Sequence, residues 1–361
     1  MSRRRLLGLA AQAGLVLPFA RMGTDLLRPS TPVQSPGTLG ATVSFRQARW
    51  LGLDPRELFD AVVSAGFSPI RVIAYWSDVE AKKGKFELAE TMWQLDRVRA
   101  GNVKAILSFG AKTPRYPEFN VPGWVLEGLD ERASSDREPF LLEHTLAFNA
   151  VVLAAAGNDP AVAYAQPGNE DLEPSEVTQW RSLSQPFVRS VVADARTRTR
   201  LPILLTSSMP LTLADFIFRA VRGHIDDALT YVDVADAVAF NTHVKIRNSL
   251  VGLTSNFNPG PHYWPMLAWL RNRTWAAGKQ AIIGELQAEP FDYTVEQGDA
   301  WGRDPNITTN DVARLDRRVR EMQFGTRLAW GVEFAYWRLK QGDSSYWGQL
   351  VSGAGAGGVL L

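Results

Sequence analysis

Short apolar runs rich in Val, Ile and Leu alternate with amphipathic stretches from residue 39 to the C-terminus. The apolar runs predict strands over 39–45, 69–75, 103–109, 162–166, 202–206, 236–241, 280–284 and 332–337. The stretches between them have helical spacing, as at 93–100 and 139–156. Strands that alternate with helices are typical of a parallel sheet built from βα units. Eight such units in about 320 residues predict an α/β fold, a single-domain (β/α)8 TIM barrel.

The first long helix has clear signals at both ends. Asp54 can cap its N-terminus, and Pro55 suits the first helical position. Leu58 and Val62 are four residues apart, which puts both side chains on one helix face. Gly66 ends the pattern. The sequence therefore predicts a helix that begins at residue 55 and buries one face.

The segment 110–136 lacks a regular pattern and carries Pro114, Pro117, Pro122 and Trp124. A long irregular loop inside a compact domain is usually functional. We expect this loop, which follows the third strand, to lie over the barrel mouth. After the eighth predicted strand the chain has room for only a short final helix, and the Gly/Ala-rich tail at 353–358 is expected to fray.

The N-terminus resembles an export signal. Arg3, Arg4 and Arg5 precede an apolar run that ends near Ala20, which is typical of a signal peptide, and paired arginines predict the twin-arginine type. The run of about 15 residues is short for a membrane span. The sequence before Ala20 is a poor cleavage site, so a cleaved signal peptide and an uncleaved membrane anchor both stay open. We divide the chain into a signal peptide or anchor (1–27), a Pro/Ser/Thr-rich linker (28–38) and one barrel domain (39–361), and expect an extracytoplasmic location.

Composition narrows the choice of partners. Hydrophobic residues make up 45% of the chain, which suits a soluble globular protein with a large core. Without the three leader arginines, 36 of the 39 Lys and Arg residues remain, against 38 Asp and Glu residues. No basic run is left in the rest of the chain. Nucleic acid is therefore not an expected partner. The absence of cysteine excludes disulfides and thiolate chemistry, and the four histidines are not spaced as a metal pair, so we expect no metal and no cofactor.

Two glutamates follow apolar runs. Glu170 comes shortly after the fourth predicted strand, and Glu285 comes directly after the seventh. The C-terminal ends of barrel strands meet at one mouth, where the active sites of this fold lie. Two carboxyl groups are the minimum for glycoside hydrolysis, one a general acid with a raised pKa and the other an ionised carboxylate. The alternative is that both are ordinary surface residues on loops.

Other side chains could serve the same mouth. Arg71 lies inside an apolar strand, where a charge is costly unless it is paired. It either contacts a catalytic carboxylate or forms a purely structural ion pair. His243 follows the sixth strand and is either part of the site or a hydrogen-bonded structural residue. The 12 tryptophans and 8 tyrosines suit sugar stacking as well as packing between barrel and helices.

The Asn169-Glu170 step on strand four and the lone Glu285 on strand seven resemble the motifs of the clan-A retaining glycoside hydrolases. The resemblance covers about residues 39–348. It implies that Glu170 is the acid/base and Glu285 the nucleophile. It also implies that Asn169 contacts the sugar 2-hydroxyl and that Arg71, on strand two, holds the nucleophile.

The same resemblance adds a histidine and three aromatic candidates. The stretch that starts at Tyr75-Trp76 resembles the segment after strand two in these enzymes, which implies substrate contacts by both residues. His243 matches a His or Tyr that contacts the nucleophile or the sugar. Trp337, on the eighth predicted strand, matches the tryptophan that forms the floor of the sugar subsite.

The chain departs from this family in two places. Lys112 and its neighbours follow strand three, where many members carry a histidine. Pro167 and Gly168 replace the usual apolar residues before the Asn-Glu step. These differences place the chain outside the best-known subfamilies and leave the substrate open.

The sequence thus predicts an exported O-glycoside hydrolase that cleaves β-glycosidic bonds of an oligo- or polysaccharide by a retaining mechanism. One alternative is a catalytically silent barrel that only binds carbohydrate; a missing carboxylate would favour it, and neither is missing. Another is metal or phosphate chemistry, which needs His/Asp ligand clusters or a Gly-rich phosphate loop. Sugar configuration, linkage, endo or exo action and oligomeric state are left open.

Overall fold

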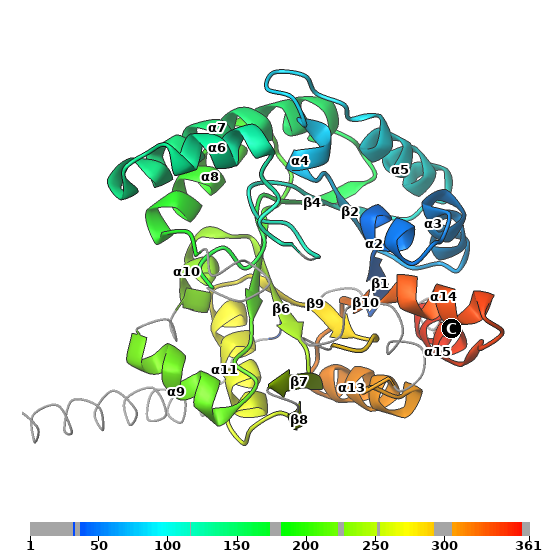
Figure 1. Ribbon diagram of the computed structural model, residues 1–361. Coiled ribbons are helices and arrows are strands. Elements are labelled where there is room, and N and C mark those ends of the chain that lie inside the picture. The colour runs from blue at the N-terminus through cyan, green and yellow to red at the C-terminus, as the bar shows by residue number, and fades with distance from the viewer. Residues whose placement is uncertain are drawn as a thin grey trace, which may run out of the picture.

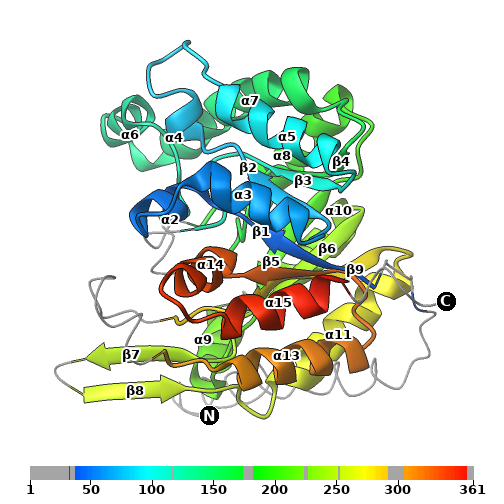
Figure 2. The ribbon, with the colours of Figure 1, turned by 90° about the vertical axis from the view of Figure 1, so that its right-hand side faces the viewer.

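Parallel strands run through the centre of the molecule and curve into a barrel (Figures 1 and 2). The computed structural model describes residue 32 and residues 37–355, except 116, 174–181, 223–226, 251–252 and 292–304. The barrel strands are β1 (Leu39–Thr42), β2 (Ile70–Ile73), β3 (Ala105–Ser108), β4 (Val162–Gln166), β5 (Leu204–Ser208), β6 (Ala237–Thr242), β9 (Gln280–Gln287) and β10 (Arg327–Trp330). They pair in the order β4-β3-β2-β1-β10-β9-β6-β5, and an isolated parallel bridge between Ala165 and Ile203 joins the ends. The predicted (β/α)8 fold is confirmed.

Helices surround the strands (Figure 1). The outer elements are α3 (Pro55–Ser64), α5 (Ala89–Ala100), α7 (Ser134–Ala156), α8 (Gln185–Arg198), α10 (Asp227–Val234), α11 (Tyr263–Ala276), α13 (Thr309–Glu321), α14 (Val332–Lys340) and α15 (Ser345–Gly355). Additional elements are α2 (Phe45–Trp50), α4 (Trp76–Val79), α6 (Gly123–Asp130), α9 (Leu213–Arg222) and the antiparallel hairpin of β7 (Ile246–Leu250) and β8 (Leu253–Phe257).

Helix α3 shows how the sequence sets an element. Asp54 Oδ1 accepts hydrogen bonds from the backbone N–H groups of Arg56 (2.8 Å) and Glu57 (3.3 Å). Pro55 occupies the first helical position, where a missing N–H costs nothing. The face that contains Leu58 is buried. The helix therefore begins at residue 55, as predicted.

A small apolar cluster fills part of the barrel interior. It consists of Ile106, Leu204, Ala237, Ala239, Ile282 and Leu328, with Tyr164 packed against it. Position 40 on β1 has room only for glycine, because a Cβ there would lie 2.0 Å from the carbonyl oxygen of Pro69. Since apolar side chains fill this layer, the polar side chains nearer the C-terminal strand ends are left to form the mouth.

The eighth strand does not lie where the sequence pattern placed it. Strand β10 ends at Trp330, and residues 332–337 belong to α14. Gly331, with φ +113°, separates the two in a left-handed conformation that glycine adopts without strain. The apolar run 328–337 is nearly continuous, so periodicity cannot separate a buried strand from a largely buried helix. Two helices, α14 and α15, therefore follow the barrel, and not one short helix.

Two further predictions need correction. The segment 110–136 is not wholly irregular, because it contains α6 and the start of α7. Helix α7 begins at Ser134, and Pro139 lies inside it and not at its start. The hairpin β7–β8 was not predicted, because it lies outside the βα alternation that defines the barrel.

The predicted leader (1–27) lies outside the described residues, as does most of the predicted linker (28–38). Among the helices of the described part, α7 alone has the length and composition that would allow a membrane span. It packs against α6 and α8. That is the environment of an outer helix of the barrel.

Candidate active site

The side chains of strand β9 change their alternation near its C-terminal end. Ile282 belongs to the inner cluster, while Ile283 and Leu286 belong to the outer core. In a regular strand, inward and outward positions alternate strictly. Here two successive residues, Gly284 and Glu285, lie between two outward-facing ones.

A β-bulge explains this change. On the β6 side, Phe240 lies opposite Ile283, and the next residue, Asn241, lies opposite Glu285. Gly284 is thus the extra residue of the bulge. The bulge turns the Glu285 side chain toward the barrel interior, where strict alternation would have turned it outward.

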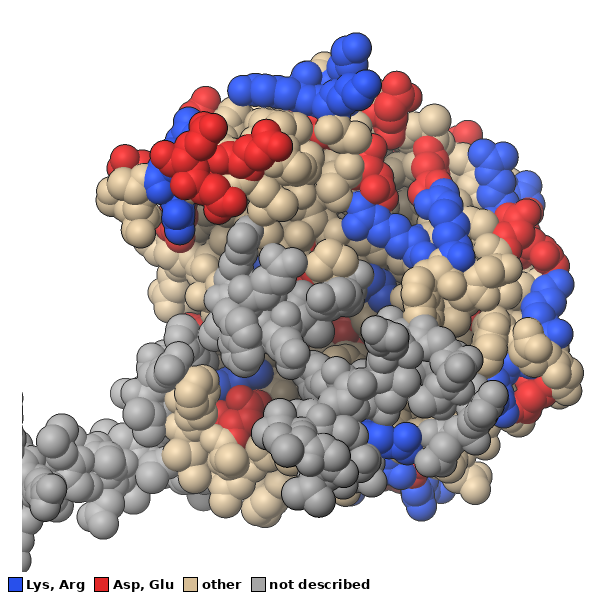
Figure 3. Space-filling model, in the orientation of Figure 1, with Lys and Arg blue, Asp and Glu red and all other residues tan. Residues whose placement is uncertain are grey.

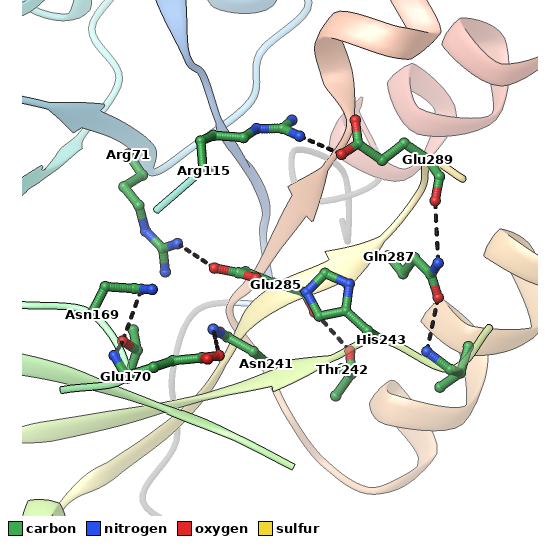
Figure 4. Close-up of polar contacts among 12 residues, drawn as sticks. Arg71, Arg115, Asn169, Glu170, Asn241, Thr242, His243, Glu285, Gln287 and Glu289 are labelled. Atoms are coloured by element: carbon green, nitrogen blue, oxygen red, sulfur yellow. Dashed lines mark hydrogen bonds and ion pairs between the residues drawn. The ribbon is translucent and has the colours of Figure 1, made fainter. Parts of the chain in front are cut away.

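The carboxyl group of Glu285 is held between two donors (Figure 4). Arg71 Nη1 donates to Oε1 at 3.3 Å, and His243 Nε2 donates to Oε2 at 2.7 Å. The Arg71 side chain is wholly buried and the Glu285 side chain is 3% exposed. Thr242 Oγ1 donates to the Glu285 carbonyl oxygen at 2.8 Å. A carboxylate bound in this way is fixed in position and has a guanidinium as its counter-charge.

Glu170 lies in a different environment. Its Oε1 accepts a hydrogen bond from Asn241 Nδ2 at 2.6 Å, and the residue is buried. Burial raises the pKa of Glu170 to about 7, with further contributions from the charges of Glu285 and Glu173, against the opposing effect of Asn241. Glu170 is therefore partly protonated near neutral pH, as a general acid must be.

The backbone of Glu170 is also unusual. Its φ of +47° lies in the left-handed region, which costs a non-glycine residue about 1–2 kcal/mol. Thr206 Oγ1 accepts a hydrogen bond from its N–H at 3.0 Å, and Lys112 Nζ donates to its carbonyl oxygen. Lys112 is wholly buried and donates also to the Glu173 carbonyl oxygen at 3.2 Å. These hydrogen bonds hold the turn that carries Glu170 in position.

Several buried polar atoms around the two carboxyl groups have no partner within the described part of the chain. Asn169 Oδ1 accepts a hydrogen bond from Thr206 at 2.9 Å, but its Nδ2 has none. The same holds for Nε and Nη2 of Arg71, Oδ1 of Asn241 and Nδ1 of His243. Buried polar groups are normally hydrogen-bonded, so these atoms suit a polar ligand. Among the described residues, no group of three or more His, Cys, Asp or Glu could hold a metal ion.

The loop after β3 lies over the mouth, as predicted, and folds back on itself. Lys112 pairs with Phe119 in an antiparallel bridge, and Asn120 N donates to the Ala111 carbonyl oxygen at 2.9 Å. Through Lys112, the base of this loop is bound to the turn that carries Glu170. Charged atoms of both signs are visible in the hollow at the centre of this face (Figure 3).

The tip of the same loop reaches the opposite side of the mouth. Arg115 forms ion pairs with Glu289 and Glu333 and lies over the Trp330 ring, 4.0 Å from its centroid. Trp330 also contacts His243, with 5.7 Å between ring centroids. The last residue of β10 therefore joins the loop to the residues that hold Glu285.

Of the aromatic predictions, the placement of Trp337 on the eighth strand is wrong, whereas substrate contact by Trp76 stays a prediction. Trp76 is wholly buried, stacked on Phe148 with 5.1 Å between ring centroids, and its Nε1 donates to Glu80 at 2.8 Å. Trp337 lies on α14, stacked on Phe334, because the eighth strand ends earlier than predicted. Trp330, and not Trp337, is the tryptophan at the end of the eighth barrel strand.

Tyr75 lies near the site, but its hydroxyl group contacts the loop after β3. Its hydroxyl group donates to the Pro114 carbonyl oxygen at 3.2 Å and is 2.8 Å from Ser44 Oγ. Arg46 lies over its ring, 4.1 Å from the centroid. Tyr75 therefore positions the loop that carries Arg115, and substrate contact by Tyr75 stays a prediction.

Sequence reasoning missed four residues of the site, Lys112, Arg115, Asn241 and Trp330. Asn241 and Trp330 lie at the C-terminal ends of strands, so their position was a usable signal. Lys112 and Arg115 lie in a loop without periodicity, and their partners are distant in sequence. No local pattern points to those contacts.

Replacing Gly284 with alanine should damage both halves of the site. A Cβ there would lie 2.5 Å from Asn241 Oδ1, 2.9 Å from Ala239 Cβ and 3.2 Å from Arg71 Nη2. We expect a loss of about 1–3 kcal/mol in the free energy of unfolding, typical of overpacking, together with a lower turnover number. Denaturant unfolding and initial rates measure the two effects. Gly123→Ala is the control, because a Cβ there has no neighbour within 4 Å; a fully active Gly284→Ala would refute this account.

No protein-family model matches the chain, and no curated protein matches it. Solved structures do resemble it. A β-galactosidase from the psychrophilic Marinomonas ef1 superposes with a TM-score of 0.55 and 14% identity, over 81% of this chain and 54% of that one. This chain thus spans about half the length of that enzyme.

Two other structures extend the comparison. A GH5_18 protein from Streptomyces cattleya, in complex with Manβ1-4GlcNAc, gives a TM-score of 0.54 at 14% identity, over 82% of this chain and 71% of that one. Xylanase 10B from Thermotoga petrophila RKU-1, in complex with xylobiose, gives 0.50 at 9% identity, over 84% and 85%. The structural neighbours are clan-A glycoside hydrolases, and at these identities the likeness shows that this chain has their (β/α)8 barrel fold.

Proposed function

We propose that this protein hydrolyses β-glycosidic bonds with retention of configuration, with Glu170 as acid/base and Glu285 as nucleophile. The observation that supports this best is the contrast between two carboxyl groups at one barrel mouth. Both are buried, but Glu285 is held between Arg71 and His243, whereas Glu170 accepts a hydrogen bond from Asn241 and has its pKa raised to about 7. Retaining hydrolysis requires one carboxyl group that donates a proton and one that stays ionised.

In the first step, Glu170 gives its proton to the glycosidic oxygen while the bond from that oxygen to the anomeric carbon breaks. A Glu285 oxygen attacks the same carbon from the opposite face and forms a glycosyl ester. The leaving group departs as an alcohol. Arg71 and His243 keep the attacking carboxylate in position, so less of the barrier is spent on orienting it.

In the second step, Glu170 acts as a base. The Glu285 charge, which contributes to the raised pKa of Glu170, is absent in the ester, so the pKa of Glu170 falls at this stage. Glu170 then takes a proton from water, whose oxygen attacks the anomeric carbon and releases Glu285 as a carboxylate. Two displacements at one carbon give a β-configured product.

The polar atoms without partners support a saccharide as the ligand. Asn169 Nδ2 has no partner among the described residues and can donate to the sugar 2-hydroxyl, the role implied by the family resemblance. The similar structures include a xylanase in complex with xylobiose and a β-galactosidase. A silent carbohydrate-binding barrel would also bind a saccharide, but it gives no reason for one buried carboxyl group that is paired with a guanidinium and a second whose pKa is raised.

Assays with 4-nitrophenyl β-glycosides test this proposal. We expect at least one of the gluco, galacto, manno and xylo compounds to be cleaved, with the β-anomer as the first product seen by NMR before mutarotation. An α-anomer would indicate inversion and contradict the nucleophile assignment. If neither these compounds nor β-glycans are cleaved, the silent barrel becomes the better account.

A further inference from the structure

Lys112 is a buried cation that the proposed mechanism does not use. It is wholly buried, and its Nζ donates to the backbone carbonyl oxygens of Glu170 and of Glu173, the latter at 3.2 Å. Both of these partners within the described residues are carbonyl oxygens, so no carboxylate in direct contact matches the charge. Burying an ammonium group in this way is costly. Departures of this kind are expected at functional sites.

The two carbonyl oxygens belong to the short turn that carries Glu170. Glu173 N donates to the Glu170 carbonyl oxygen at 3.2 Å, which closes this turn. The φ of Glu170 is +47°, and a left-handed residue persists only where its surroundings hold it. Thr206 Oγ1 accepts from the N–H of Glu170, and Lys112 Nζ donates to its carbonyl oxygen. Lys112 therefore holds one side of the residue whose carboxyl group is the proposed acid/base.

The charge of Lys112 also acts on the Glu170 carboxyl group. Burial has the largest effect on the pKa of Glu170 and raises it, as do the charges of Glu285 and Glu173. The hydrogen bond from Asn241 and the charge of Lys112 lower it, and the result is a pKa of about 7. Lys112 thus keeps the pKa of Glu170 from rising further.

Two other cations face Glu170, but each has a carboxylate partner. Arg71 on β2 and Arg219 on α9 are both affected by the charge of Glu170. Each forms an ion pair with a different carboxylate, at 3.3 Å and 3.2 Å respectively. Glu118, on the loop after β3, is a further carboxyl group affected by the Glu170 charge. Of these three cations, Lys112 is the one without a carboxylate in contact among the described residues.

We propose that Lys112 is a positioning residue whose ammonium group holds the Glu170 turn and whose charge lets this carboxyl group serve first as acid and then as base. Glu170 must be protonated in the first step and ionised in the second. A nearby positive charge favours the ionised form. Without it, Glu170 would stay an acid to higher pH but would be ionised too rarely to be an effective base. This inference rests on the proposed function, because it concerns the same two steps.

Titration of the Glu170 carboxyl group tests this without turnover. Protein labelled with ¹³C at Cδ of glutamate is titrated by NMR, and the Glu170 signal is the one missing from Glu170→Gln. We expect a higher midpoint in Lys112→Met, which removes charge and donors, and in Lys112→Gln, which removes the charge but keeps a donor. Lys82→Met, an exposed change, is the control and should leave the midpoint unchanged. An unchanged or lower midpoint in a folded Lys112 variant would overturn the proposal.

The wild-type protein gives a second test that needs no change at Lys112. Among the described residues Lys112 is the one buried lysine, so its ammonium protons should exchange most slowly with water, which identifies its NMR signal. This signal should shift with the midpoint of Glu170, and the shift should be absent from Glu170→Gln. A Lys112 signal that does not respond to Glu170 would contradict the proposal even if neither Lys112 variant folds.

Kinetics distinguish this role from a purely structural one. On glycosides with poor leaving groups, the loss of kcat/KM at high pH should move to higher pH in Lys112→Gln. A lower rate with an unmoved pH profile would show a structural role and reject the proposal. If no glycoside is hydrolysed, a raised midpoint would uphold the effect of the Lys112 charge and reject the glycosidase proposal. Hydrolysis with an unchanged midpoint would do the reverse.

Discussion

Glu285→Ala should abolish glycoside hydrolysis on every substrate, with turnover reduced at least about 10⁴-fold. Without this carboxylate no glycosyl ester can form, and neither Arg71 nor His243 can replace it, because both are donors in their contacts with Glu285. Initial rates on an aryl β-glycoside measure the loss. The effect should not depend on the leaving group, since the missing step is attack on the anomeric carbon.

Added azide gives this variant a distinctive product. A small anion can occupy the space left by the carboxylate and attack from the same face, so the product should be an α-glycosyl azide. Glu127→Ala, an exposed change on α6, is the control and should keep full activity. A folded Glu285→Ala protein with more than a few per cent of wild-type turnover would assign the nucleophile to another residue.

Glu170→Ala should lose activity according to the leaving group. Natural glycosides need a proton on the departing oxygen and should fail, with a loss of about 10²–10⁴-fold, typical of a general acid. Aryl glycosides with acidic phenols leave without that proton and should still form the ester. Hydrolysis of the ester also needs Glu170, so the ester should accumulate, and stopped-flow kinetics should show a burst of phenol followed by a slow phase.

The reaction with azide distinguishes Glu170→Ala from Glu285→Ala. It should react with the accumulated ester, speed the slow phase and give a β-glycosyl azide, because the second displacement restores the original configuration. Equal losses on natural and activated substrates would show that Glu170 is not the proton donor. Glu173→Ala is no substitute for this test, because its carboxyl group accepts from Ser207 and Tyr231 and so supports the fold of the turn.

The barrel could be predicted because its alternation of strands and helices is a long-range pattern carried by many residues. The fourth strand even has the predicted bounds, 162–166. The prediction of the eighth strand at residues 332–337 was wrong, because a mostly buried helix there shows the same apolar run as a buried strand. Gly331 marks the boundary, but only its positive φ shows this, and that is a property of the fold.

The candidate site was predictable where residues lie at strand ends. Asn169, Glu170 and Glu285, with Arg71 and His243, do meet at one mouth, although their roles stay predictions. The bulge was not predictable, and strict alternation along β9 would turn Glu285 away from the interior. The contacts of the loop after β3 were not predictable either. Lys112 binds a carbonyl oxygen 58 residues away, and such a contact leaves no periodic signal in the sequence.

The boundary between β4 and β5, the two ends of the strand order, is a weakly paired seam of the barrel. Strands β4 and β5 are joined through one isolated bridge, Ala165–Ile203, whereas β6 and β9 pair along most of their length. Segments with few ladder hydrogen bonds open at lower free energy than the rest of a domain. Glu170 follows β4, beside this seam, and Glu285 lies within the long ladder. The proposed proton donor thus lies where few ladder hydrogen bonds hold the strands and depends on side chains, those of Thr206 and Lys112, for its position, while the proposed nucleophile is held by the backbone ladder itself.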